Sequence, residues 1–504
     1  MTEVLIGNDS TGVACVKITK GTYDPITTSD ALRERFYFNS KWKDQVDTPD
    51  IEQCTQVGGS SEGGDRQPSG ASSSSFTRAR YWYGTAAGRM TFYWFAKARF
   101  PGLRYNVPII DLKHRAANGR FQQGKQVRKE RGFANDFGVY GGRIEFDRPR
   151  GEWFTGYNYD IDGASYDVNQ ASCSGPIDIG GSSADTVFAV VWNLPGNNVD
   201  LDGPSSPPSP SGKETVLITS TQCRVAKPGY DVNSATPEQL AFDSTGRPLN
   251  VIAAADIAVP AGASSYDTGI DLPDAVVAEV CFYTGSTLYY PSIPRDSDGL
   301  GAEYWFDGTR IRFNNDGVAC RARFIIFGVD PLGPSSGAND VLRPFTDGGE
   351  NHVQFLRPGA SATPRFSDIV IDSRRPVIQI LADGYVGVPV ADGHSQTISF
   401  DAAGFFPLVK FVTVHGSGGD GLSTWSTRSR APVVKRLLPQ IVSGQNQNAG
   451  DSAHCTYTAT GATFFTNRGK PVDRYYTSLG ELVTVADSNP IVGIRWFVLG
   501  IPLP

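Results

Sequence analysis

The sequence predicts an all-β protein made of three tandem antiparallel β-sandwich domains. Composition is the first indication, because the 504 residues include 56 glycines and 33 prolines, and aromatic residues make up 11%. This usage is typical of many short strands joined by turns. The apolar runs are short, rich in Val, Ile, Phe and Tyr, and bounded by turn residues, as expected of strands. A chain of this length also exceeds what one hydrophobic core organises.

An internal repeat is the second indication. The segments that begin at Lys227 and at Arg357 share K/R-P-G, S-A-T-P, D-S and R-P in the same order. They also end alike, since Arg323–Val329 matches Arg495–Ile501 position for position. A repeat of this length indicates two copies of one domain.

The first 200 residues or so predict a third, more divergent copy. Lys20 opens a related phrase, and the apolar segment 188–195 matches the closing strands of the other copies. Residues 47–75 and 111–137 have no counterpart there and are interpreted as loop insertions. Linkers rich in Pro, Ser and Gly then separate the copies. The predicted domains are 1–205, 213–332 and 345–504.

Local patterns predict individual elements within a copy. Residues 236–239 read T-P-E-Q, which predicts one helical turn with a capping box. Bulky residues alternate in 188–192, as in a half-buried strand. In 324–327 they do not alternate, which indicates a strand buried on both faces.

The cysteines are interpreted as buried free thiols. The chain has seven: Cys15, Cys54, Cys173, Cys223, Cys281, Cys320 and Cys455. The repeat places three of them opposite valines, as Cys223 with Val353, Cys281 with Val412 and Cys320 with Val492. A position that accepts either residue is a small apolar slot, which free Cys often fills. With no Cys-x-x-Cys spacing for zinc, this favours assembly in a reducing cytoplasm over a disulfide framework.

Short motifs that suggest chemistry lack their structural context. Residues 416–421 fit G-x-G-x-x-G but no helix pattern follows, and 119–125 resemble a phosphate loop without its Ser or Thr. Residues 333–337 match G-x-S-x-G inside a Pro-rich linker. The histidines show no metal spacing. We therefore expect no catalytic residue, no metal site and no cofactor.

Charge and hydropathy bear on three further classes of partner: calcium, nucleic acid and membrane. Asp-x-Asp-Gly turns, as at 160–163, offer oxygen ligands, so calcium stays an alternative to plain turns. The net charge of -6 gives no overall attraction to nucleic acid. No apolar stretch is long enough to span a membrane, and no signal peptide is expected at the N-terminus.

Two groups of residues are candidate contact sites. The densest basic run is a candidate interface with an acidic partner or an anionic glycan, with a solvated arm as the alternative; it comprises Lys113, Arg115, Arg120, Lys125, Arg128, Lys129 and Arg131. Aromatic residues near predicted loop tips are candidates for surface recognition; they are Trp425, Tyr289 and Tyr290.

The phrase [K/R]-P-G-x-D-V, followed by T-x-x-x-L-x-F, resembles modules in tail structural proteins of tailed bacteriophages. It stands here as residues 227–232 and 236–242. The resemblance implies a non-enzymatic virion component, such as a tail fibre, tail tip or minor tail protein, assembled in the bacterial cytoplasm and involved in host attachment. It further implies a homo-oligomer, trimer or hexamer, that contacts other tail or neck proteins and needs no cofactor.

Three alternatives to this function are a glycan-binding adhesin, a glycan depolymerase, and a decoration protein of the capsid or neck. A depolymerase needs paired carboxylates in one cleft, which the sequence does not locate. Because domain 1 alone carries the basic run and the insertions, we expect domain 1 to anchor the protein in the particle.

Overall fold

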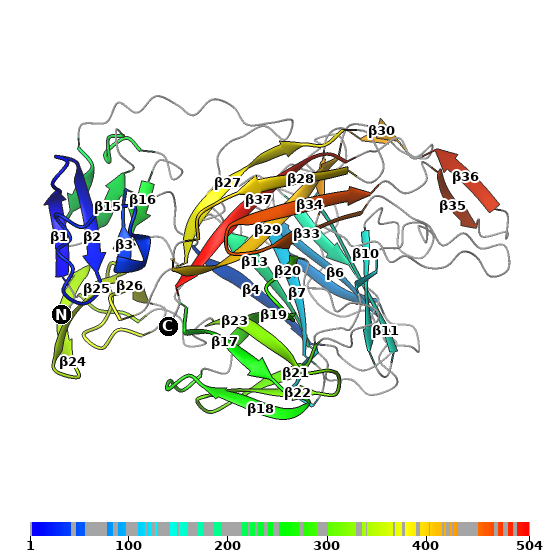
Figure 1. The fold of residues 1–504 in the computed structure, drawn as a ribbon, viewed down its shortest axis with the longest axis horizontal. Helices are drawn as coiled ribbons and strands as arrows, with labels where there is room; N and C mark the ends of the chain where they lie inside the picture. Colours follow the sequence, from blue (N-terminus) through cyan, green and yellow to red (C-terminus); the bar gives the residue numbers. More distant parts are fainter. Residues whose placement is uncertain are drawn as a thin grey trace.

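The computed structural model describes residues 3–41 and most of 214–290, 301–328, 335–415, 452–467 and 491–502, with the backbone of single strands in between (Figure 1). In these parts the chain is all-β, as predicted. A 3-10 turn is formed by Arg33–Arg35. The strand pairs are antiparallel throughout.

Each copy begins with a three-stranded sheet, and we call these three the opening sheets. Their strands, in spatial order, are β1 (Glu3–Asn8), β2 (Ala14–Thr19) and β3 (Phe36–Asn39); β14 (Val216–Ile218), β15 (Cys223–Ala226) and β16 (Leu240–Asp243); and β24 (Leu342–Asp347), β25 (Glu350–Leu356) and β26 (Ile369–Asp372). All lie at one end of the molecule, on the left in Figure 1.

The opening sheets share one register. Each has a bulge where its third strand meets the middle strand, at Ile18/Thr19, Val225/Ala226 and Phe355/Leu356. Directly after the third strand each has a serine that is bonded twice to the middle strand, through its backbone N–H and its hydroxyl. The pairs are Ser40 with Val16, Ser244 with Cys223 and Ser373 with Val353, all at 2.8–3.0 Å.

The opening sheets bury their apolar faces against each other. Their shared core includes Val16, Ile18, Phe38, Cys223, Val225, Phe242, Val353, Phe355 and Ile371. Phe242 lies at its centre, with its ring 6.1 Å from that of Phe38 and 5.5 Å from that of Phe355. Residues from all three copies therefore form one small core.

The remainder of each copy contributes an inner sheet of three strands. In each inner sheet the central strand is the last of the three in the chain. The strands, in spatial order, are β4 (Asp47–Thr55), β13 (Thr186–Asn193) and β7 (Ile109–Arg115); β17 (Ala253–Val259), β23 (Cys320–Gly328) and β19 (Val276–Tyr283); and β27 (Gln379–Gly387), β37 (Ile491–Pro502) and β29 (Phe405–His415). β19 is buried along its whole length. Its continuous run of buried residues follows from packing on both faces.

Outer strands cover the inner sheets. They are β18 (Gly262–Asp267), β22 (Arg310–Asn315) and β21 (Glu303–Asp307); β28 (His394–Ser399), β34 (Gly461–Asn467) and β33 (Ser452–Tyr457); β6 (Arg89–Ala96), β12 (Gln170–Ser174) and β11 (Gly151–Tyr159), with β5 (Arg78–Tyr83) at the edge. Phe313 packs on Phe324, and Phe464 on Trp496, with ring centroids 5.9 and 6.3 Å apart. Two layers of this kind form a β-sandwich core.

A short strand after each inner edge strand pairs with the outer strands of a different copy. These connecting strands are β8 (Phe121–Gln122), β20 (Leu288–Tyr290) and β32 (Arg428–Arg430). β8 pairs with β21, β20 with β33, and β32 with β11. The remaining strands are β9 (Val127–Arg128), β10 (Gly142–Arg148), β30 (Gly418–Gly419), β31 (Thr424–Trp425), β35 (Val472–Tyr476) and β36 (Leu482–Ala486).

Two segments interpreted as loop insertions begin as strands. Residues 47–55 form β4, and 111–115 lie in β7, followed by β8. The sequence gives only a weak signal for these two strands, because polar and charged residues interrupt their short period-2 patterns. The predicted helical turn at 236–239 and the Gly/Ser-rich stretch 56–75 lie outside the described residues.

Candidate functional site

The described members of the basic run belong to the fold of the chain itself. Lys113 and Arg115 lie on β7, and burial lowers the pKa of Arg115. Arg120 precedes β8, and its Nη1 lies 2.9 Å from Oε2 of Glu303 while its guanidinium stacks 4.5 Å from the ring of Trp305. Arg120 therefore connects the first copy to the second.

The remaining candidates of the basic run stay predictions. Arg128 lies on β9, where its backbone pairs with Glu145 of β10. Its side chain, together with Lys125, Lys129 and Arg131, lies outside the described residues, as does the side chain of Trp425 on β31.

The prediction that Tyr290 is a surface-recognition residue is wrong. Tyr290 is 3% exposed, and its ring packs 5.6 Å from that of Phe411. It is buried because β20 pairs edge to edge with β33 of the third copy, a pairing that no local pattern predicts. Tyr289 is half-buried opposite Thr456 in the same pairing.

A buried ion pair lies where the three copies meet. Nζ of Lys410, on β29, is 2.8 Å from Oε1 of Glu279, on β19. The ammonium group also lies 4.9 Å from the ring centre of Trp192, on β13, and 4.5 Å from that of Tyr290. Lys410 and Trp192 are each 0% exposed. The pair therefore joins the inner sheets of the copies at a position shielded from solvent.

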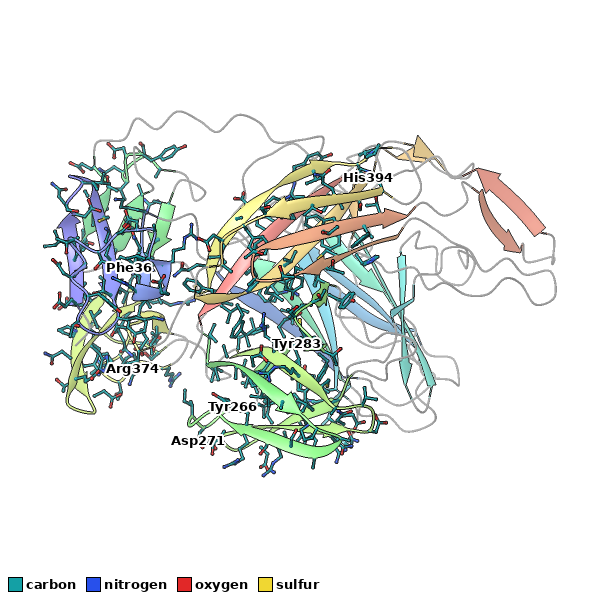
Figure 2. All side chains as sticks on the ribbon, viewed as in Figure 1. Phe36, Tyr266, Asp271, Tyr283, Arg374 and His394 are labelled. Atoms are coloured by element: carbon teal, nitrogen blue, oxygen red, sulfur yellow. The ribbon has the colours of Figure 1, made fainter. Side chains whose placement is uncertain are left out.

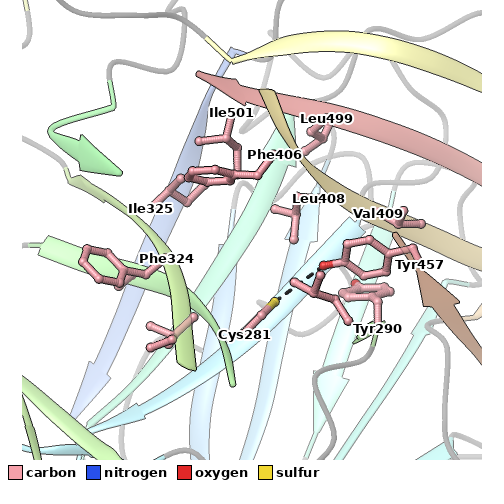
Figure 3. Packing of buried hydrophobic residues seen from close by; sticks show 14 of the residues in the cluster. Cys281, Tyr290, Phe324, Ile325, Phe406, Leu408, Val409, Tyr457, Leu499 and Ile501 are labelled. Atoms are coloured by element: carbon pink, nitrogen blue, oxygen red, sulfur yellow. Dashed lines mark hydrogen bonds between the residues drawn. The ribbon is translucent and has the colours of Figure 1, made fainter. Parts of the chain in front are cut away.

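The thiols are structural, as predicted for those described. Cys15, Cys223, Cys281, Cys320 and Cys455 are free and buried. Burial raises the pKa of Cys15 to about 11 and that of Cys223 to about 12. Cys281 lies within the main core, where its Sγ is 3.7 Å from the hydroxyl of Tyr457 (Figure 3). Protonated, enclosed thiols of this kind are poor nucleophiles.

The G-x-S-x-G match is a structural hydrogen-bond clamp. Ser335 donates its hydroxyl to Asp368 over 2.6 Å and accepts the backbone N–H of Ser361 over 2.9 Å. Asp368 is buried and accepts two more backbone N–H bonds, from Ser335 and Arg365. The Asp368 carboxylate thus holds Ser335 and Arg365 together, and the Ser335 hydroxyl is engaged in these hydrogen bonds.

The described part of the chain shows neither a metal cluster nor a membrane-crossing helix. No group of three or more His, Cys, Asp or Glu residues is placed to hold a metal among the described side chains. Within the same residues, no helix has the length and apolarity needed to cross a bilayer.

Exposed apolar residues gather on the opening sheets. Of the large hydrophobic residues that are exposed in the described chain, all but Val318 belong to these sheets or their loops: Val4, Ile6, Tyr23, Ile26 and Ile218. Most come from the first copy. Exposed apolar residues that lie close together are typical of a protein-binding surface. We call this set the apolar patch.

An ion cluster supports the loop that carries Tyr23 and Ile26. The ammonium groups of Lys17 and Lys41 each lie 2.6–2.8 Å from carboxylate oxygens of both Asp9 and Asp30. Burial alone would raise the pKa of Asp9, but hydrogen bonds from both lysines and Thr11 hold it well below its usual range. The cluster thus ties this loop to β2 through ion pairs within the chain.

Neither the ion pair nor the apolar patch follows from the sequence motifs. A signal for the ion pair does exist, because Glu279 and Lys410 interrupt the apolar runs that the repeat aligns. The apolar patch has no such signal, since exposure of Val4 or Ile6 on an edge strand depends on how the three opening sheets pack.

Comparisons with protein-family models, with curated proteins and with solved structures return no match.

Proposed function

We propose that the protein is a non-enzymatic structural component of a bacteriophage virion, of the tail fibre, tail tip or minor tail protein type. The apolar patch is the observation that carries the proposal. It offers a preformed protein-binding surface on a β scaffold, beside the ion cluster of Lys17, Lys41, Asp9 and Asp30. Proteins that assemble into particles need such surfaces.

The position of the apolar patch supports the expectation that the first copy anchors the protein in the particle. Val4 and Ile6 lie on β1, an edge strand, and Tyr23 lies in the loop after β2, where the guanidinium of Arg35 stacks 4.6 Å from its ring. A flat apolar edge of this kind pairs readily with another chain. We expect an adjacent virion protein to cover it.

A charge placed in the apolar patch tests the proposal. Ile6→Glu should prevent incorporation of the protein into phage particles while leaving its circular dichroism and unfolding temperature unchanged, because the side chain is already exposed. Ser395→Glu is the matched control, since Ser395 is exposed on β28, away from the opening sheets. Normal incorporation of both variants, or absence of the wild-type protein from particles, would refute the proposal.

A further inference from the structure

The strand pairing between copies closes into a cycle. The connecting strand of the first copy, β8, extends the outer strands of the second; that of the second, β20, extends those of the third. The connecting strand of the third copy, β32, extends the outer strands of the first. Three heterologous contacts that return to their starting point are the arrangement of a threefold ring.

The contacts also agree in register. Phe121 of β8 lies opposite Tyr304, which in turn lies opposite Phe313 of the central outer strand. Tyr290 of β20 lies opposite Cys455, which lies opposite Phe464 of the equivalent strand. Two of the three contacts thus share a register, and together with the shared register and bulge of the opening sheets this relates the copies more closely than strand order alone.

One buried position carries opposite charges in two of the copies, which is possible because the copies belong to a single chain. Glu279 lies opposite Ile325, and Lys410 lies opposite Phe497. The repeat aligns Arg323 with Arg495, so Ile325 matches Phe497 and Glu279 matches Lys410. In a ring of identical chains this position would carry like charges in close contact. Here one copy supplies the anion and another the cation, which requires different copies on one chain.

We infer that a single chain takes the place of a homotrimer and binds alone to a partner of threefold symmetry. The chain closes its ring internally, so it needs no further copies of itself. Its opening sheets present matching positions on their edge strands, opposite Val16, Cys223 and Val353 of the shared core: Ile6, Ile218 and Pro344, all exposed. A threefold partner meets the same kind of apolar edge three times.

The mass in solution tests the first half of this inference directly. Light scattering after size exclusion should give the mass of one chain, 54.3 kDa, across a hundredfold range of concentration. A trimer or hexamer of the chain would overturn the inference. This measurement does not depend on the proposed function.

A circular permutant tests the equivalence of the copies with the full chain. The order 206–504 followed by 1–205, joined by a linker as long as residues 329–341, should fold as a monomer with an unfolding temperature close to that of the wild type. If the copies are equivalent, the gap from Pro502 to Glu3 equals the gap between the end of β23 and the start of β24, which residues 329–341 bridge. A permutant opened between Ile325 and Ile326, inside β23, is the control that should fail.

The outcomes separate cleanly. If both permutants fail to fold, the three junctions are not equivalent and the inference is wrong. The binding half rests on the proposed function and is tested by copy number: purified particles should contain one chain for each threefold site. Three chains at each site would overturn the inference, whereas absence of the protein from particles would overturn the proposed function and leave the monomer result standing.

Discussion

Replacing Lys410 by methionine should destabilise the protein more than any exposed charge substitution. Methionine has a similar length, so the packing against Trp192 and Tyr290 is largely kept. Glu279, however, is left buried without the ammonium group at 2.8 Å. Removing one member of a buried pair costs about 3–5 kcal/mol, because the remaining charge is uncompensated.

The exposed pair of Arg310 and Asp267 provides the matched control. Its atoms are equally close, at 2.7 Å, but both side chains are more than 40% exposed. Surface pairs contribute about 0–1 kcal/mol, so Arg310→Met should have a small effect. Because the N–O distances of the two pairs are nearly the same, a larger loss of stability in Lys410→Met than in Arg310→Met would be due to burial.

A double-mutant cycle completes the test. Lys410→Met combined with Glu279→Leu should recover most of the loss, because a buried pair replaced by apolar residues is often neutral or stabilising by about 1–4 kcal/mol. Urea unfolding followed by circular dichroism measures the free energies of all four proteins. The reasoning is refuted if Lys410→Met costs less than about 1 kcal/mol, or if the double variant is as unstable as the sum of the singles.

Four further predictions follow from the described contacts. The stability that the lowered pKa of Asp9 contributes is present above about pH 4 and lost as pH falls through its folded pKa, so the difference in unfolding temperature between wild type and Asp9→Asn should shrink between pH 7 and pH 2.5; a constant difference contradicts it. Ser244→Ala leaves the buried N–H of Cys223 without its side-chain acceptor and should cost about 1–3 kcal/mol in urea unfolding; a neutral variant would show that the bond is dispensable. Cys281→Val should change stability by less than about 1.5 kcal/mol, and non-reducing gels of the wild type should show no shift on reduction; a shifted band would reveal a disulfide. The fragment 213–504 should lose cooperative unfolding, because it lacks Trp192 and the first opening sheet; a cooperative melt would show that two copies suffice.

The all-β class and the buried thiols could be predicted because both have local or repeated signatures. Turn residues delimit the strands, and a valine in one copy identifies the cysteine slot in another, as at Val353 and Cys223. The position of Tyr290 could not be predicted, because its burial depends on a strand of another copy more than 160 residues away. Pairing between distant strands leaves no periodicity in either one. The strands β4 and β7 are not evident from the sequence, because their charged residues resemble those of surface loops.

The connecting strands are preceded in the chain by segments that differ in sequence and length between the three copies. They comprise residues 116–120, 284–287 and 416–427. A homotrimer must display the same loop three times, and any change in it is made three times at once. A chain that carries its three copies in tandem can alter one loop while the other two keep their contacts. A change in one loop therefore leaves the contacts of the other two copies intact, so the surface can differ on one side of the threefold axis.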